Sequence, residues 1–279
     1  MYERVTQKLV DELRQGHVPW SRPWRSDLTG LPRNYVSNRP YSGVNVLLVW
    51  LSALERGFTD ARWLTANQIT ALGGSFRGER ATRVVFAREI TRAAGTENEE
   101  TFFVLRGYNV FNVEQVEGVV LEPEDAPGPL AERLGHAEAF IAAQGVAITH
   151  GGDRAYYAPA KDAVRLPFPG SFSTSEAYYA VALHELAHAT AHPTRLDRPT
   201  GPRGSRAYAF EELVAELAAA FVCAELGVGP APHHAGYLQF YVQLLEDDPR
   251  AIFRAARVAG RAADFMRLQV SGPPLQAAA

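Results

Sequence analysis

Residues 180–188 read Ala-Val-Ala-Leu-His-Glu-Leu-Ala-His, an H-E-x-x-H motif that follows an apolar run. Residues four apart lie on one face of a helix, so His184 and His188 are expected to bind one metal ion together. Glu185 is expected to act as the catalytic general base, taking a proton from a water that the metal activates. With eight His among 279 residues, a chance match is expected only about 0.02 times per chain. The motif therefore predicts a metal-binding helix.

A catalytic zinc usually takes a third protein ligand, which must come from a later part of the chain. The candidates are His192, Asp197, Glu211, Glu212 and Glu216. His192 would lie about 12 Å along the helix axis from His184, too far to share its metal. Glu216 is the only charge in the apolar run 213–224, and Glu212 lies one helical turn before it. We predict a helix over 208–226 in which Glu212 binds the metal and Glu216 holds a His ring; a structural carboxylate pair is the alternative.

The expected metal is Zn²⁺, although Mn²⁺ or Co²⁺ can occupy the same kinds of ligand. Tyr208 and Tyr178 are candidate hydrogen-bond donors to an oxyanion during peptide cleavage. A packed Tyr is the commoner explanation for each of them.

Charge divides the chain into two parts. Residues 1–110 contain fifteen basic and eleven acidic residues, whereas the whole chain has a formal net charge of −3. A basic first part and an acidic remainder predict two modules with different partners. Three prolines in the eight residues 122–129 indicate a linker. We therefore expect domains at 1–121 and 130–270, followed by a frayed tail at 271–279.

The same composition bounds the cellular location. Cys223 is the single cysteine, which fits a reducing compartment. The first residues lack the apolar core of a signal peptide, and no apolar run reaches the roughly 18 residues that span a bilayer. The expected location is a bacterial cytoplasm, or delivery into one during conjugation, with no membrane partner.

Cations and aromatic rings alternate in the first module, as in proteins that stack single-stranded bases beside a basic groove. Structural packing of these rings is the alternative. The candidate DNA-contact residues are Trp20, Arg22, Trp24, Arg25, Arg33, Tyr35, Arg39, Tyr41, Asn45, Arg77, Arg80 and Arg83. Strand-forming residues at 82–90 and 101–108 predict a hairpin in this module.

Several segments together resemble the ArdC-like antirestriction proteins of conjugative plasmids. In the second module they are 184–188, His-Pro-Thr-Arg-Leu-Asp-Arg at 192–198 and Tyr-Ala-Phe-Glu-Glu-Leu-Val-Ala-Glu at 208–216. In the first they include Arg-Pro-Tyr-Ser-Gly-Val-Asn at 39–45 and Tyr-Asn-Val-Phe-Asn at 108–112. Arg80 and Arg83 stand in a segment where that family often has Lys, which changes the contact geometry.

The resemblance implies a two-domain α+β protein: a small domain that binds single-stranded DNA, then a zincin-like metallopeptidase domain with an H-E-x-x-H helix and a Glu-bearing helix. It implies protection of incoming mobile DNA from host restriction, with a host restriction protein or a repressor as the candidate peptide substrate. Two alternatives stay open. One is a regulatory metalloprotease that cleaves a repressor or host protein, and the other is a DNA-binding protector whose metal site is structural.

Overall fold

The structure is a computed structural model that describes residues 2–20, 30–92, 100–122, 129–229 and 235–271. The chain forms two compact units, one of residues 32–124 and one of residues 1–31 with 125–279. Each unit combines helices with a β-sheet, as expected for the α+β class. The chain passes from the smaller unit to the larger one between Glu124 and Asp125, inside the segment where the sequence predicts a linker.

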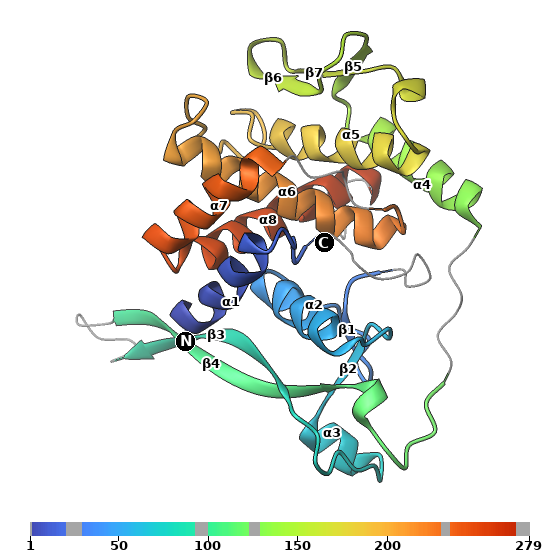
Figure 1. Cartoon of the computed structure of the whole chain (residues 1–279), viewed down its shortest axis with the longest axis vertical. Coiled ribbons are helices and arrows are strands. Elements are labelled where there is room, and N and C mark those ends of the chain that lie inside the picture. Colours follow the sequence, from blue (N-terminus) through green and yellow to red (C-terminus); the bar gives the residue numbers. More distant parts are fainter. Residues whose placement is uncertain (1, 21–29, 93–99, 123–128, 230–234, 272–279) are drawn as a thin grey trace, which may run out of the picture. The chain divides into compact units, whose positions relative to one another are not determined.

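The smaller unit is built on a four-stranded sheet in the order β1-β2-β4-β3 (Figure 1). Its elements are β1 (Arg33–Asn34), α2 (Val44–Arg56), β2 (Arg62–Thr65), α3 (Ala66–Ala71), β3 (Thr82–Arg92) and β4 (Glu100–Asn112). β3 and β4 form the predicted hairpin, which is longer than the sequence indicated. α2 packs on β3, and Ser52 on α2 bonds Thr82 on β3 through their side-chain oxygens at 2.5 Å.

The larger unit consists mainly of helices and also contains a three-stranded sheet in the order β5-β7-β6. Its strands are β5 (Ala147–His150), β6 (Tyr156–Ala158) and β7 (Ala163–Leu166). Its helices are α1 (Tyr2–Arg14), α4 (Leu130–Ala143), α5 (Ser175–Ala189), α6 (Arg206–Leu226), α7 (Ala235–Asp247) and α8 (Ala251–Ser271). α6 packs against both α5 and α8, which places its middle in the core (Figure 1).

Local capping fixes the ends of α5 and α6. α5 begins after Thr174, whose side chain accepts the hydrogen bond from the Ala177 amide. α6 begins after Ser205, whose hydroxyl accepts from the Tyr208 amide. α6 ends at Gly227, where φ is 65°, a conformation that favours glycine.

The N-terminal helix belongs by its contacts to the larger unit. The Thr6 hydroxyl on α1 donates to the Pro249 carbonyl at 2.6 Å, and the rings of Tyr2 and Phe253 meet edge to face at 4.6 Å. Residues 1–31 therefore belong to the larger unit, whereas the sequence had grouped them with residues 32–121. Among the described residues, no helix is long and apolar enough to cross a membrane.

Candidate metal centre

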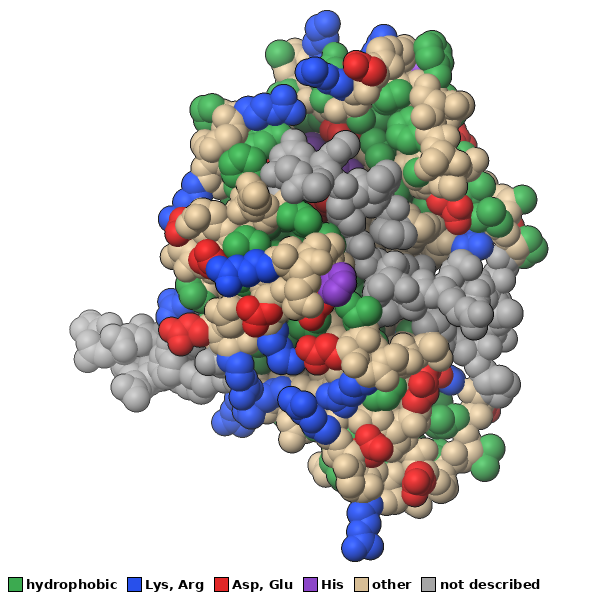
Figure 2. Space-filling model, in the orientation of Figure 1, with side chains coloured by type: hydrophobic (Ala, Val, Ile, Leu, Met, Phe, Trp, Pro, Cys, Tyr) green, Lys and Arg blue, Asp and Glu red, His purple; other side chains and the backbone are tan. Residues whose placement is uncertain are grey.

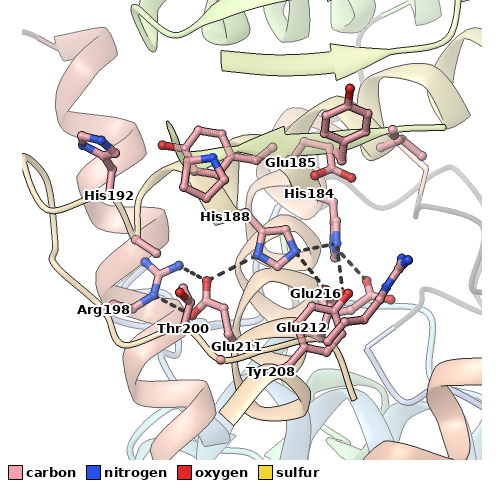
Figure 3. A pocket seen from close by; sticks show the side chains of 18 of the residues that line it. His184, Glu185, His188, His192, Arg198, Thr200, Tyr208, Glu211, Glu212 and Glu216 are labelled. Atoms are coloured by element: carbon pink, nitrogen blue, oxygen red, sulfur yellow. Dashed lines mark hydrogen bonds and ion pairs between the residues drawn. The ribbon is translucent and has the colours of Figure 1, made fainter. Parts of the chain in front are cut away.

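Two segments of the larger unit meet at the candidate centre: the H-E-x-x-H turn of α5 and the part of α6 that contains Glu211, Glu212 and Glu216. His184 and His188 lie one turn apart on α5, so both rings point from one face of the helix. Glu212 and Glu216 lie one turn apart on α6, which packs against that face. Figure 3 shows both rings turned toward these carboxylates.

His184, His188 and Glu212 form the metal-ligand group found among the described residues, with their ligand atoms within 4.8 Å of one another. The two Nε2 atoms are 3.1 Å apart. Glu212 has one carboxylate oxygen 3.7 Å from Nε2 of His184 and the other 3.6 Å from Nε2 of His188. Two nitrogens that each bind a tetrahedral zinc at about 2.0–2.1 Å are themselves about 3.3 Å apart. The donor set therefore fits a divalent cation.

The remaining ring nitrogen of each His faces a second carboxylate. Nδ1 of His188 lies 3.4 Å from Glu211, and Nδ1 of His184 lies 3.8 Å from Glu216. An acceptor at Nδ1 holds the proton there and leaves Nε2 free for a metal. The predicted position of Glu216 beside a His agrees with this geometry. The matching role of Glu211 is one that the sequence does not reveal.

Glu211 is itself fixed by Arg198, from the loop between α5 and α6. Arg198 donates to both Glu211 oxygens, from Nη2 at 2.6 Å and from Nε at 3.0 Å (Figure 3). Both side chains are buried, with 7% and 6% of their surface exposed. Arg198 also donates to the Ala187 carbonyl at 2.9 Å and to the Thr190 hydroxyl, so it closes the C-terminal end of α5. One guanidinium thus connects the loop, α5 and α6 beside His188.

Electrostatics in the metal-free protein follow from this crowding. Burial alone lowers the pKa of His188, but hydrogen bonds to Glu211 and Glu212 outweigh it and raise the pKa to about 10. For His184, burial is likewise outweighed, chiefly by Glu212, and the pKa is raised. Burial raises the pKa of Glu212, but the two His rings more than compensate and hold it well below its usual range. Without a metal, the carboxylates therefore keep protons on the two His rings, at the place where a metal ion would bind.

The three candidate ligands line a cavity of about 810 Å³ in the larger unit. Its wall includes the predicted general base Glu185, which is 7% exposed, and Tyr208. The space-filling view shows His and acidic side chains at the bottom of a hollow (Figure 2). The open side of the donor set therefore faces a space that can receive another molecule.

Other predicted residues lie away from the ligand group. The Tyr178 hydroxyl is 3.0 Å from Nε2 of His150, and Tyr178 is outside the described lining of the cavity. His192 also lines the cavity, but its Nδ1 contacts the Thr194 hydroxyl at 2.7 Å, and Figure 3 shows it apart from the other two rings. Tyr208 is therefore the predicted tyrosine that reaches the cavity.

Comparison with known proteins matches each half of the chain to a family model. Residues 1–111 match the N-terminal domain of anti-restriction factor ArdC, and residues 135–258 match a zincin-like metallopeptidase. The crystal structure of the metal-free antirestriction protein ArdC from plasmid R388 has a TM-score of 0.83 and 35% identity, covering 97% of this chain and 98% of that one. The chain belongs to the ArdC family. The predicted family and two-domain α+β class are thereby confirmed.

The chain is also similar to two bacterial proteins and to a second ArdC crystal structure. An uncharacterized protein, y4eC of Sinorhizobium fredii, is 40% identical over 97% of this chain and 92% of its own length. DNA primase TraC of Escherichia coli is 36% identical over 95% of this chain, but the match spans only 27% of that protein. A second crystal structure of R388 ArdC is bound to Mn(II), with a TM-score of 0.81 and 34% identity. A divalent metal therefore suits the ArdC fold, and the choice of zinc stays a prediction.

Three of the predicted DNA-contact residues are buried. Trp20 is 1% exposed, and its ring packs edge to face on Tyr241 at 6.0 Å. Tyr41 is also buried, and burial raises the pKa of its hydroxyl to about 12. Asn45 donates to the Val85 carbonyl at 2.7 Å and accepts from the Val85 amide at 2.8 Å. These side chains pack or support the fold instead of meeting solvent, which corrects the expectation that they are open to a base.

The other predicted contacts fall into three groups. Arg39, Arg77, Arg80 and Arg83 are exposed. Arg33 and Tyr35 are half-buried, and the Arg62 guanidinium lies 5.4 Å from the centre of the Tyr35 ring. Arg22, Trp24 and Arg25 lie outside the described residues. The exposed aromatic surface of the smaller unit lies elsewhere, on β3 and β4, and the alternation of side chains in those strands is the sequence signal that could have indicated it.

Proposed function

We propose that this ArdC-family protein binds single-stranded DNA without sequence preference and carries a Glu-type zincin site, and that it protects incoming mobile DNA from host restriction. The observation that carries the enzymatic half is one cavity lined by His184, His188, Glu212 and Glu185. The R388 ArdC and TraC matches support action on transferred DNA in a bacterial cytoplasm. The peptide substrate that fits this role is a host restriction protein.

The roles of the side chains follow from their positions. His184, His188 and Glu212 would hold the cation, for which we propose Zn²⁺, with Mn²⁺ or Co²⁺ as alternatives. When bound, the cation would supply Lewis-acid activation of the reacting groups. Glu185 is buried in the cavity wall, where its carboxylate can accept a proton and return it to a leaving amine. Tyr208 in the same wall can donate its hydroxyl proton to a developing oxyanion.

The decisive experiment separates metal binding from catalysis with Glu185→Gln, which keeps the size of the side chain but removes the base. We expect the variant to retain wild-type metal content by elemental analysis. We also expect it to lose protection of an unmodified plasmid introduced into a restricting host. Glu132→Gln, on the exposed surface of α4, is the matched control and should retain both properties.

One alternative has its own support in the structure. Arg198 and Glu211 join three segments around the donor set, as expected if a cation serves to hold α5 and α6 together. If Glu185→Gln protects as well as wild type, the metal site is structural and the protein is a DNA-binding protector. Protection that needs Glu185 but not DNA binding would instead indicate a regulatory metalloprotease that cleaves a repressor or host protein.

A further inference from the structure

The ribbon of β3 and β4 carries an exposed aromatic pair. Side chains of directly paired residues share a face of an antiparallel sheet, and so do residues two apart in one strand. Phe86 pairs with Arg106, and Tyr108 lies two residues after Arg106. Phe86, Arg106 and Tyr108 therefore share one face of the ribbon.

The two rings of this face are open to solvent. Phe86 is 48% exposed and Tyr108 is 46% exposed, and their centroids are 5.5 Å apart at an interplanar angle of 75°. An edge-to-face pair leaves a broad ring surface uncovered, which carries apolar area that water solvates poorly. The rings contact each other, but they lie outside the buried core, so core packing does not account for their exposed surface.

The described side chains of the ribbon carry positive charge only. Arg106 is exposed beside the rings. The described side chains of the ribbon belong to residues 82–86 and 106–112, which contain two Arg and no acidic residue. The described rings and cations complement a partner with flat apolar groups and negative charge.

The second arginine, Arg83, belongs to the opposite face. It pairs with Asn109, and its guanidinium lies against the Cα of Gly107, where any larger side chain would collide with it. Gly107 pairs with Val85, two residues after Arg83, so the glycine and Arg83 share that face. Among its described side chains, the ribbon thus offers one arginine on each face and the aromatic pair on only one.

We infer that the face defined by Phe86, Arg106 and Tyr108 binds a single nucleic-acid strand, with bases stacked on the two rings and Arg106 against the phosphates. Unpaired bases expose the flat surfaces that such rings bind, whereas in a duplex those surfaces are covered by neighbouring base pairs. The inference rests on the proposed DNA-binding function and gives it a surface. Its residues take the place of the buried Trp20, Tyr41 and Asn45 as the expected DNA contacts.

The test uses the full-length protein and a fluorescein-labelled 20-nucleotide oligo-dT, followed by fluorescence anisotropy at several salt concentrations. The double variant Phe86→Leu/Tyr108→Leu keeps apolar bulk but removes both rings, and we expect affinity to fall roughly fivefold to a hundredfold. Phe240→Leu removes a ring that is 49% exposed on α7 and should bind as wild type does.

Charge variants test the face independently of the rings. Arg106→Gln is expected to weaken binding and to reduce the slope of log affinity against log salt by about 0.7, the loss of one phosphate contact. Arg83→Gln removes the same charge from the opposite face and should weaken binding less than Arg106→Gln does. Arg257→Gln, on the exposed surface of α8, should leave affinity unchanged.

The outcomes separate this inference from the function on which it rests. If wild-type protein does not bind the oligonucleotide at low salt, the proposed DNA-binding function is wrong. If wild type binds but the double Leu variant binds equally well, the strand contacts another surface and the inference is wrong. An effect of Arg83→Gln as large as that of Arg106→Gln would overturn the choice of face, even if the double variant folds poorly.

Discussion

The α5–α6 centre and the β3–β4 ribbon hold their polar groups in opposite ways. In the centre, Glu211 and Arg198 are each about nine-tenths buried and hold each other in one arrangement beside His188. On the ribbon, Phe86 is 48% exposed and Arg106 lies on the surface. A metal needs donors fixed before it arrives, whereas a flexible strand can adapt to a surface that is only exposed and positively charged. Substitutions in the α5–α6 centre should therefore change metal affinity and stability much more than substitutions on the ribbon change strand binding and stability.

The largest effect is expected from removing the third metal ligand. Glu212→Ala takes away the carboxylate that lies within 3.7 Å of both His rings, and it leaves His184 without its strongest partner. We expect divalent-metal affinity to fall more than about a hundredfold, beyond the effect typical of residues that only orient a ligand. Competition with a chromogenic chelator measures the change. Wild-type affinity in the variant would move the third ligand to another residue.

The next largest effect is expected at Arg198. Arg198→Met leaves Glu211 buried without its cation, which costs about 3–5 kcal/mol of stability, and metal affinity should fall about 10–100-fold as His188 loses its orientation. Arg198→Lys restores charge without the two-pronged contact and should be intermediate. Arg195→Met is the matched control, because Arg195 lies in the same loop but pairs with Asp162 at 2.8 Å. Equal loss of metal in both Met variants would make Arg198 merely structural.

The contrast also explains which parts of the site the sequence predicts. The three candidate ligands and Glu216 lie in helices, where a fixed repeat of 3.6 residues places side chains on a known face. A single charge in an apolar helix, such as Glu216, also indicates that a polar partner lies beside it. Arg198 acts from an irregular loop in which Asp197 has a φ of 45°, and no repeat reveals where such a side chain points. Glu211 was visible as a candidate, but its role depends on that loop.

The ribbon residues were missed for a different reason. Rings and cations in the proline-rich segment 17–45 suggested a binding surface, but amino-acid type does not distinguish a buried Trp from an exposed one. Trp20 is covered by α7, and Asn45 completes the backbone hydrogen bonds of Val85 at the edge of the sheet. Both contacts join residues distant in sequence, so local pattern does not show them.

A smaller effect is expected from pH, because the buried His rings of the centre bind protons more tightly than exposed His rings do. The pKa values of both His rings are raised in the metal-free protein, that of His188 to about 10. Protons therefore occupy the site at neutral pH and must leave when a metal binds. Apparent metal affinity should rise with pH, by about tenfold per pH unit for each proton displaced. Calorimetric titration in buffers of different ionisation enthalpy measures the protons released; none released between pH 6 and 8 would contradict the electrostatics of the site.

The stability of the metal-free protein should change with pH in the opposite direction to metal affinity. A group whose pKa is higher in the folded than in the unfolded state stabilises the fold below its unfolded pKa, about 6.5 for His. That stabilisation is lost as pH rises toward about 10, where His188 releases its proton. Metal-free protein should therefore become less stable from pH 7 to 10, while metal-loaded protein changes less. Thermal unfolding of both forms across this range measures the difference.

The smallest effect is expected for the stability of ribbon variants. It shows whether the exposed Arg106 side chain contributes to binding or to the stability of the fold. Arg106→Gln should change the free energy of unfolding by less than about 0.5 kcal/mol, because an exposed side chain is replaced by another polar one. Val84→Ala, on the same face but fully buried, should cost roughly 2 kcal/mol. Urea unfolding of the two variants measures both. If Arg106→Gln destabilises the protein as much as Val84→Ala, Arg106 supports the fold, and the role of its exposed charge in binding a nucleic-acid strand would be contradicted.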